Sequence, residues 1–235
     1  MQAGGVTGQL PVNDIHPAMQ VLGRFGGTPM VRIELQGCDV RCAWCSVPET
    51  HQLHTEPNRK PRRLTAARRG DRDGEWRRPF SKWAMLSVEE ILGACSKFRQ
   101  KHVVVTGGEP LLHDVLPLAQ KLLSVGYRVQ IETSGTREVI GVAQQLWYSV
   151  SPKFHPTLPL KQSTLQRADE IIYPVLNSTS IPRLQSEVIP HLRKHVPVYL
   201  HVVNGDARLV SKAMAASFSH NYLLTSEYRE TAVAM

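Results

Sequence analysis

Hydrophobic and polar residues follow two different periods along the chain. Strict alternation over 30–35 places Val31, Ile33 and Leu35 on one face, as in a β-strand. Short apolar runs predict further strands at 102–106, 127–132, 147–151, 170–176, 196–203 and 222–225. Longer amphipathic stretches between these runs predict helices at 87–99, 111–126, 136–146, 181–195 and 207–219.

Strands and helices therefore alternate, in roughly six units. This order is typical of an α/β protein with a parallel sheet, which is either a partial barrel or an open sheet. In both architectures, the residues that bind ligands lie in the loops that follow the strands. We expect residues 1–235 to form a single domain that carries one insertion.

Four of the expected strands are followed by loops of unusual composition. The first loop holds three of the four cysteines, Cys38, Cys42 and Cys45, in the spacing C-x3-C-x2-C. The other loops read TGGEP (106–110), TSG (133–135) and SPK (151–153). Because parallel strands end at one edge of a sheet, we expect the four loops to converge there. The fourth cysteine, Cys95, lies on the apolar face of an expected helix and is predicted to be a core residue.

The clustered cysteines favour a reducing compartment and metal binding over a disulfide framework. Three thiolates on a short loop can hold an iron–sulfur cluster and leave one iron open. A zinc ion would need a fourth ligand, such as His51 or His54. Residues 1–17 do not have the pattern of a secretory signal, and no apolar run is long enough to span a membrane. We therefore expect a cytoplasmic protein.

The formal net charge is +8, and much of the basic excess falls within residues 55–83. We interpret this segment as a basic insertion after the first expected strand. A basic patch can contact nucleic acid, so a zinc-bound, basic nucleic-acid-binding protein is one alternative. That alternative gives no role to the glycine pair or the SPK loop, and a solvated loop explains the charge more simply.

The loops after the strands carry small, acidic and basic groups. The glycine pair at 107–108 lets the backbone approach a ligand closely, because no Cβ is in the way. Glu109 can accept hydrogen bonds from an amino group, and Lys153 can bind a carboxylate. Trp44 offers an aromatic face to a purine, and Ser134 and Ser151 add hydroxyl donors. Together these groups suit an amino acid joined to a nucleoside, as in S-adenosylmethionine.

The segments LQGCDVRCAWC, HVVVTGGEPLLHDVLPL, QIETSGTREV and VSPK together resemble the radical S-adenosylmethionine superfamily, and within it the 7-carboxy-7-deazaguanine synthase family. The resemblance is good over 31–153 and implies a partial (β/α)6 TIM-like barrel. It also implies that Cys38, Cys42 and Cys45 hold a [4Fe–4S] cluster that reductively cleaves S-adenosylmethionine. The residues expected at the S-adenosylmethionine site are Trp44, Ser46, Gly107, Gly108, Glu109, Ser134, Ser151, Pro152 and Lys153.

In that family the substrate is 6-carboxy-tetrahydropterin, magnesium assists, and ammonia leaves as 7-carboxy-7-deazaguanine forms for queuosine biosynthesis. The resemblance therefore implies a carbon–nitrogen lyase with a pterin-like substrate. It further implies an electron donor such as flavodoxin or ferredoxin, and a homodimer. The positions expected to face the substrate are Met19, Gln20, Val21, Glu34 and Thr106.

This chain departs from the family at the substrate and magnesium positions. Leu22 replaces a carboxylate in the family's QGEG motif, and Glu34 replaces an arginine that meets the substrate carboxylate. Arg32 lies on the same strand face, about 6.6 Å away. Val47 stands where a threonine binds magnesium, and valine cannot ligate a hard cation. These differences leave open a paralogue that acts on another small molecule without magnesium.

Overall fold

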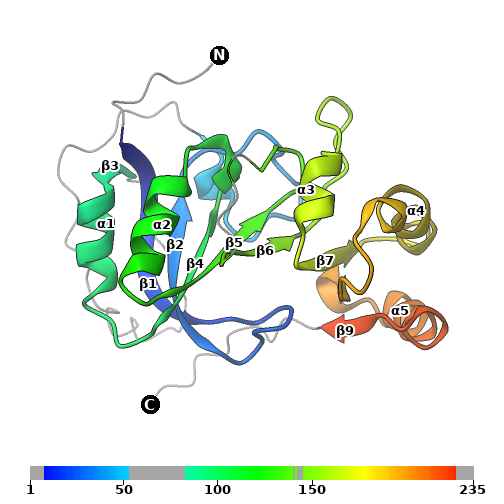
Figure 1. The fold of residues 1–235 in the computed structure, drawn as a ribbon. Helices are drawn as coiled ribbons and strands as arrows, with labels where there is room; N and C mark the ends of the chain where they lie inside the picture. The colour runs from blue at the N-terminus through cyan, green and yellow to red at the C-terminus, as the bar shows by residue number, and fades with distance from the viewer. Residues whose placement is uncertain (1–7, 53–82, 140, 142–144, 226–235) are drawn as a thin grey trace, which may run out of the picture.

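The computed structural model describes residues 8–52, 83–139, 141 and 145–225. In these residues, nine strands form one sheet in the order β3-β1-β2-β4-β5-β6-β7-β8-β9. The strands from β2 to β9, other than β3, run parallel, whereas β1 pairs antiparallel with both β2 and β3. The sheet has two edges, β3 and β9, so the barrel is partial and open (Figure 1).

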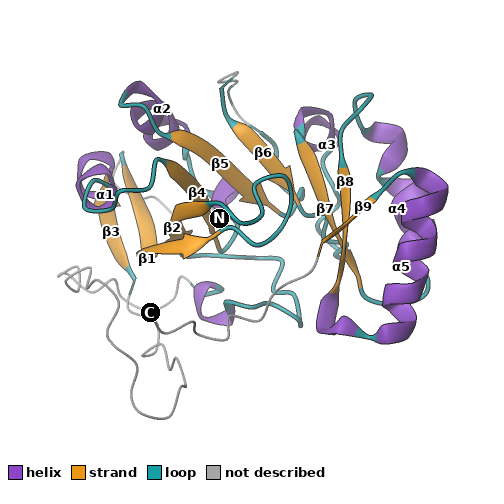
Figure 2. Cartoon of the chain, turned by 90° about the horizontal axis from the view of Figure 1, so that it is seen from below, coloured by secondary structure: helices purple, strands orange, loops and turns teal. Residues whose placement is uncertain are grey.

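The strands are β1 (Gln9–Met19), β2 (Pro29–Leu35), β3 (Ala84–Ser87), β4 (His102–Gly107), β5 (Arg128–Thr133), β6 (Trp147–Val150), β7 (Glu170–Val175), β8 (Val198–Val202) and β9 (Leu223–Thr225). The α-helices are α1 (Val88–Cys95), α2 (Leu116–Ser124), α3 (Gln162–Arg167), α4 (Ser180–Glu187) and α5 (Ala207–His220). Short 3-10 turns lie at Pro48–Thr50, Pro110–Leu112, Ile189–His191 and Val203–Gly205. Figure 2 shows the α-helices along the outer face of the sheet.

Two hydrophobic clusters bind the helices to the outer face of the sheet. The first joins α1 and α2 to β2, β4 and β5, and Ile33, Val105 and Ile131 are completely buried in it. The second joins α3, α4 and α5 to β7 and β8, around Ile171 and Leu200. Because side chains alternate along a strand, the intervening residues face the interior of the partial barrel.

The strands predicted after residue 30 are confirmed, with ends that differ by a residue or two. The helix that follows β3 begins with a capping box. The Ser87 hydroxyl accepts a hydrogen bond from the Glu90 N–H at 3.2 Å, and Glu90 accepts one from the Ser87 N–H at 2.8 Å. This helix, α1, ends at Cys95 rather than at 99.

Two further predicted helices were also too long. The helix expected over 111–126 begins only at Leu116, because Pro117 is tolerated in a first helical turn but not in a helix interior. The helix expected over 181–195 ends at Glu187, and a 3-10 turn that contains Pro190 follows it.

The helix predicted over 136–146 is wrong for the described residues 136–139, 141, 145 and 146, none of which is helical. Gly141 has φ +80°, a left-handed conformation that does not continue a right-handed helix. The basic insertion at 55–83 lies outside the described residues except for Trp83, which is buried.

The sequence did not predict β1, β3 or α3. In β1, two prolines and a register shift between Val12 and Asp14 interrupt the alternation that marks a strand. Among the described residues, no helix is long and apolar enough to cross a membrane.

Candidate active site

The C-terminal ends of β2, β4, β5 and β6 meet at one edge of the sheet. In the parallel register Leu35 lies beside Gly107, and Thr133 lies beside Val150. The four loops singled out in the sequence therefore start at the same edge, as predicted. Main-chain hydrogen bonds also join these loops, from the N–H of Glu109 to the carbonyl of Gly37 (2.8 Å) and from Lys153 to Ser134 (3.0 Å).

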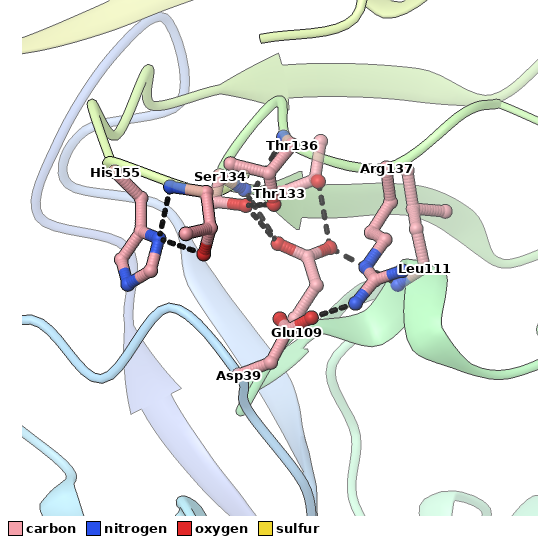
Figure 3. A network of polar contacts seen from close by, with 9 residues as sticks. Asp39, Glu109, Leu111, Thr133, Ser134, Thr136, Arg137 and His155 are labelled. Carbon is pink, nitrogen blue, oxygen red and sulfur yellow. Dashed lines mark hydrogen bonds and ion pairs between the residues drawn. The ribbon is translucent and has the colours of Figure 1, made fainter. Parts of the chain in front are cut away.

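The cysteine loop is fastened at both ends. Gln36, just before the loop, donates from Nε2 to the carbonyl oxygens of Glu49 (2.9 Å) and Gln52 (2.6 Å). Asp39, just after Cys38, forms an ion pair with Arg137 from the segment that follows β5 (Figure 3). The protein itself therefore holds the loop near the edge of the sheet.

Gly108 is required by the close approach of the TGGEP loop to the cysteine loop. A Cβ at this position would lie 2.1 Å from the carbonyl oxygen of Gly37, far inside van der Waals contact. Gly107 has φ +100°, and its Cβ would lie 2.5 Å from the nitrogen of Leu35. The glycines thus let two loops of the protein meet, and their approach to a ligand stays a prediction.

The three loop cysteines are free thiols with partial exposure, whereas Cys95 is buried, as predicted. Burial raises the pKa of Cys38, Cys42 and Cys45, while nearby Lys153 lowers it for Cys42 and Cys45. Burial alone raises the pKa of Cys95 to about 12. The loop thiols thus differ from Cys95 in their partial exposure, and Lys153 opposes the rise in pKa for Cys42 and Cys45.

Within the described part of the chain, no group of three His, Cys, Asp or Glu side chains is arranged to hold a single metal ion. A zinc ion requires its ligands close together, because each Zn–S bond is only about 2.3 Å long. A cubane cluster can be held by sulfur atoms farther apart, because each thiolate binds a different iron. Among the described residues, the side chains as they stand therefore form no zinc site.

Glu109 is buried and points into the TSG loop (Figure 3). Its Oε1 accepts hydrogen bonds from the Thr133 hydroxyl (2.7 Å) and the Leu111 N–H (3.1 Å). Its Oε2 accepts from the Ser134 N–H (2.8 Å) and the Ser134 hydroxyl. A carboxylate offers about four acceptor positions, so protein donors already use them. Glu109 thus holds two loops together, and its contact with an amino group stays a prediction.

Lys153 lies between the cysteine loop and the interior of the partial barrel. Its ammonium group donates to the Ser151 hydroxyl. Burial lowers the pKa of Lys153, and the thiolates and two carboxylates around it, Glu109 and Glu132, oppose that shift. Of the other expected cofactor residues, Pro152 is buried, whereas Trp44 and Ser46 are exposed on the cysteine loop.

A row of polar residues crosses the inner face of the sheet just below this edge. Glu34 lies beside Thr106 in the register of β2 and β4, and Glu132, Ser149 and Glu170 continue the row on β5, β6 and β7. The Thr106 hydroxyl donates to Glu132 at 2.8 Å. Burial raises the pKa of Glu170, which accepts a hydrogen bond from the Arg24 N–H at 2.7 Å. The row gives the interior a set of oriented carboxylates.

Of the positions expected to face the substrate, the structure brings three to this row. Gln20 is buried and donates to Glu132 at 2.8 Å, so it joins Thr106 and Glu34 there. Met19 is 48% exposed at the end of β1, and Val21 is partly buried. The sequence reasoning missed Glu132, although alternation in QIET could have placed it on the inner face.

Val47 is buried, and its carbonyl oxygen accepts a hydrogen bond from the Thr50 hydroxyl at 2.8 Å. Its side chain therefore packs inside the cysteine loop and offers no oxygen to a cation.

Comparison with known proteins shows a family match over the residues that form this site. The family model described as "Radical SAM superfamily" matches residues 35–153, which include all four loops. The 7-carboxy-7-deazaguanine synthase of Escherichia coli (strain K12) is 37% identical over 71% of this chain and 72% of its own length. The synthase of Buchnera aphidicola is 32% identical over 92% of this chain and 94% of its own length.

The fold agrees with these relatives. The crystal structure of QueE from Escherichia coli superposes with a TM-score of 0.79 at 31% identity, over 93% of this chain and 94% of that one. Membership of the radical SAM superfamily implies a [4Fe–4S] cluster and S-adenosylmethionine, which decides between the two metals that the cysteines left open. The chain therefore belongs to the radical SAM superfamily and, within it, to the 7-carboxy-7-deazaguanine synthase family.

Proposed function

We propose that the protein is a carbon–nitrogen lyase that converts 6-carboxy-tetrahydropterin to 7-carboxy-7-deazaguanine with loss of ammonia. The observation that carries the proposal is the position of the polar row directly beside the cysteine loop and Lys153. Glu132 is oriented by two protein donors, Gln20 and the Thr106 hydroxyl, one on each of its oxygens. Its remaining acceptor positions suit the amino and ring N–H groups of a pterin.

The chain's own residues would bind and orient both cofactors. Cys38, Cys42 and Cys45 would hold the cluster, and Lys153 would bind the carboxylate of S-adenosylmethionine. Trp44 and the hydroxyls of Ser46 and Ser151 complete the proposed nucleotide side of the site. When bound, the cluster and S-adenosylmethionine supply the radical that removes a hydrogen atom from the substrate. The interior of the partial barrel, where the buried Gln20 donates to Glu132, would exclude water from that reaction.

The direct test is product analysis. We would reconstitute the cluster anaerobically, add S-adenosylmethionine, a chemical reductant and 6-carboxy-tetrahydropterin, and measure both products by mass spectrometry. The proposal expects 5′-deoxyadenosine and 7-carboxy-7-deazaguanine together. 5′-Deoxyadenosine without the deazaguanine would refute the substrate and retain the radical chemistry.

A second candidate function is the same radical chemistry on a different small molecule, without magnesium. Two observations favour it, the buried carboxylate of Glu34 and the buried aliphatic side chain of Val47. A panel of pterins and related acids, each assayed with and without magnesium, separates the candidates. Turnover of 6-carboxy-tetrahydropterin that magnesium stimulates would exclude the second candidate.

We further propose a single domain over 1–235, a cytoplasmic location, reduction by flavodoxin or ferredoxin, and a homodimer. The support for these proposals is the family resemblance. Light scattering of the purified protein measures its oligomeric state. Replacing the chemical reductant with reduced flavodoxin or ferredoxin in the product assay tests the electron donor.

A further inference from the structure

Exposed cations lie at the end of the partial barrel opposite the candidate active site. Lys101 immediately precedes β4, Arg128 begins β5, and Arg24 belongs to the hairpin that joins β1 to β2. The Arg128 N–H donates to the Lys101 carbonyl at 2.8 Å, so the starts of the two strands lie side by side. The length of β4 places these three residues, which we call the rim cations, about 20 Å from the cysteine loop.

Each rim cation is held against an aromatic ring. The distance to the ring centroid is 5.7 Å for Arg24 over Trp147, 5.3 Å for Arg128 over Phe25 and 4.7 Å for Lys101 over Tyr127. Phe25 also packs edge-on against Trp147, with centroids 5.1 Å apart, so the hairpin and β6 share one aromatic base. A cation within about 6 Å of a ring centroid is attracted by the ring face, which restricts where the charge can point.

The protein supplies no counter-charge to the rim cations. Arg167 and Arg183 also lie over aromatic rings, but each of them forms an ion pair with a carboxylate. By contrast, none of the rim cations forms an ion pair with any residue that the structure describes. All three are exposed, and so are Lys97 and Arg99, just before β4. The rim therefore presents oriented positive charge that the described residues do not neutralise.

We infer that the rim cations bind the phosphate backbone of a single-stranded nucleic acid. Guanidinium groups match phosphate oxygens with paired hydrogen bonds, and a lysine adds a point charge. The three cations come from three separate segments along the rim, which suits a chain of phosphates better than a single phosphate group. This contact lies at the end of the barrel away from the candidate active site, so it does not depend on the proposed reaction.

Other anionic partners fit this rim less well. A membrane surface requires apolar side chains that insert among the lipids, but the aromatic rings here lie beneath the cations. An acidic electron donor would dock near the cysteine loop, at the opposite end of β4. Because the rings are covered, they do not stack on bases, and the contact recognises charge rather than sequence.

The test is the binding of a fluorescently labelled oligouridine to the cluster-reconstituted protein, followed by anisotropy over a range of salt concentrations. The rim variant combines Arg24→Met, Lys101→Met and Arg128→Met. The control variant combines Lys161→Met, Arg208→Met and Lys212→Met, which lie before α3 and on α5 and lower the net charge equally. Residues 55–83 stay unchanged in every protein, so the basic insertion contributes equally to all of them. Circular dichroism verifies that each variant is folded.

The rim variant should bind oligouridine about 10- to 100-fold more weakly than wild type at low salt. The slope of log affinity against log salt should become shallower by about 2, because each cation that contacts a single strand contributes about 0.7. The control variant should stay within about twofold of wild type. Arg128→Lys retains the charge and should keep the wild-type slope. Oligocytidine should bind as oligouridine does, because the contact is with phosphate.

Equal losses in the rim and control variants would show that only net charge matters and would overturn the inference. A wild type that does not bind oligouridine would also overturn it. Two further arms identify other anions. If inorganic phosphate displaces oligouridine at an equal concentration of phosphate groups, the rim is a single-phosphate site instead. If the rim variant loses binding to vesicles that contain phosphatidylserine but keeps its binding to oligouridine, the rim contacts a membrane instead.

Discussion

Glu109→Gln tests whether Glu109 organises the protein before any cofactor binds. Each Glu109 oxygen accepts two hydrogen bonds, and those on Oε2 come from the N–H and hydroxyl of Ser134. A glutamine supplies one oxygen and one NH2 group, so donors would face donors at one of the two positions. The Ser134 hydroxyl can rotate to accept, but its N–H cannot.

The magnitude follows from the groups left without partners. One main-chain N–H loses its acceptor, and the remaining hydrogen bonds lose the charge on the carboxylate. Together these changes should lower the free energy of unfolding by about 2–4 kcal/mol. We would measure it by urea denaturation of the protein without cluster or S-adenosylmethionine, so that cofactor binding does not contribute.

Glu90→Gln is the matched control for this substitution. Glu90 is exposed and closes the capping box of α1, a position in which glutamine also serves. Its free energy of unfolding should stay within about 0.5 kcal/mol of wild type. If Glu109→Gln were as stable as wild type and lost only S-adenosylmethionine affinity, Glu109 would act on the cofactor, and our account of the loops would be wrong.

Three further substitutions test other parts of the structure. Gly108→Ala should displace the cysteine loop, because the new Cβ would lie 2.1 Å from the Gly37 oxygen. The amount of iron bound after reconstitution should therefore fall several-fold. The control is Gly93→Ala on α1, where a Cβ meets no atom within 4 Å, and this variant should bind as much iron as wild type. Cys95→Ala should retain the full iron content and lose about 1 kcal/mol of stability, because Cys95 is a core residue. Burial raises the pKa of Glu170, so its contribution to stability should fall as pH rises from its ordinary pKa of 4.5 through the raised value. Glu170→Gln removes that titration, so its free energy of unfolding, relative to that of wild type, should be higher at pH 8 than at pH 5.

The sequence predicted those elements of the fold in which the local pattern of apolar residues matches their burial in the structure. The run Val103–Val105 is completely buried, because both faces of β4 are covered, and a fully buried strand reads as a continuous apolar run. β1 gave no such signal because Pro11, Pro17 and the register shift break its alternation. Its place in the sheet depends on pairing with β2 and β3, which are distant in sequence from one another.

The candidate site also has parts that the sequence predicted and parts that it did not. The cysteine, TGGEP, TSG and SPK loops were predictable because each follows a strand directly, and strand order then brings them together. The direction of Glu109 and the role of Glu132 were not predictable, because both depend on the register of neighbouring strands. The contact of Arg32 with Glu34 was also missed, because side chains that lean along the strand come within 3.2 Å although their Cα atoms are about 6.6 Å apart.

The hairpin that joins β1 to β2 covers one of the buried carboxylates of the interior. Phe25 packs edge-on against His102 and Trp147, which lie toward the other end of the partial barrel. A Cβ on Gly23 would lie 2.7 Å from the Glu170 carboxylate, so the hairpin closes tightly over that buried acid. Leu22 belongs to the same turn. A substitution at Leu22 should therefore also change how the buried Glu170 carboxylate is covered.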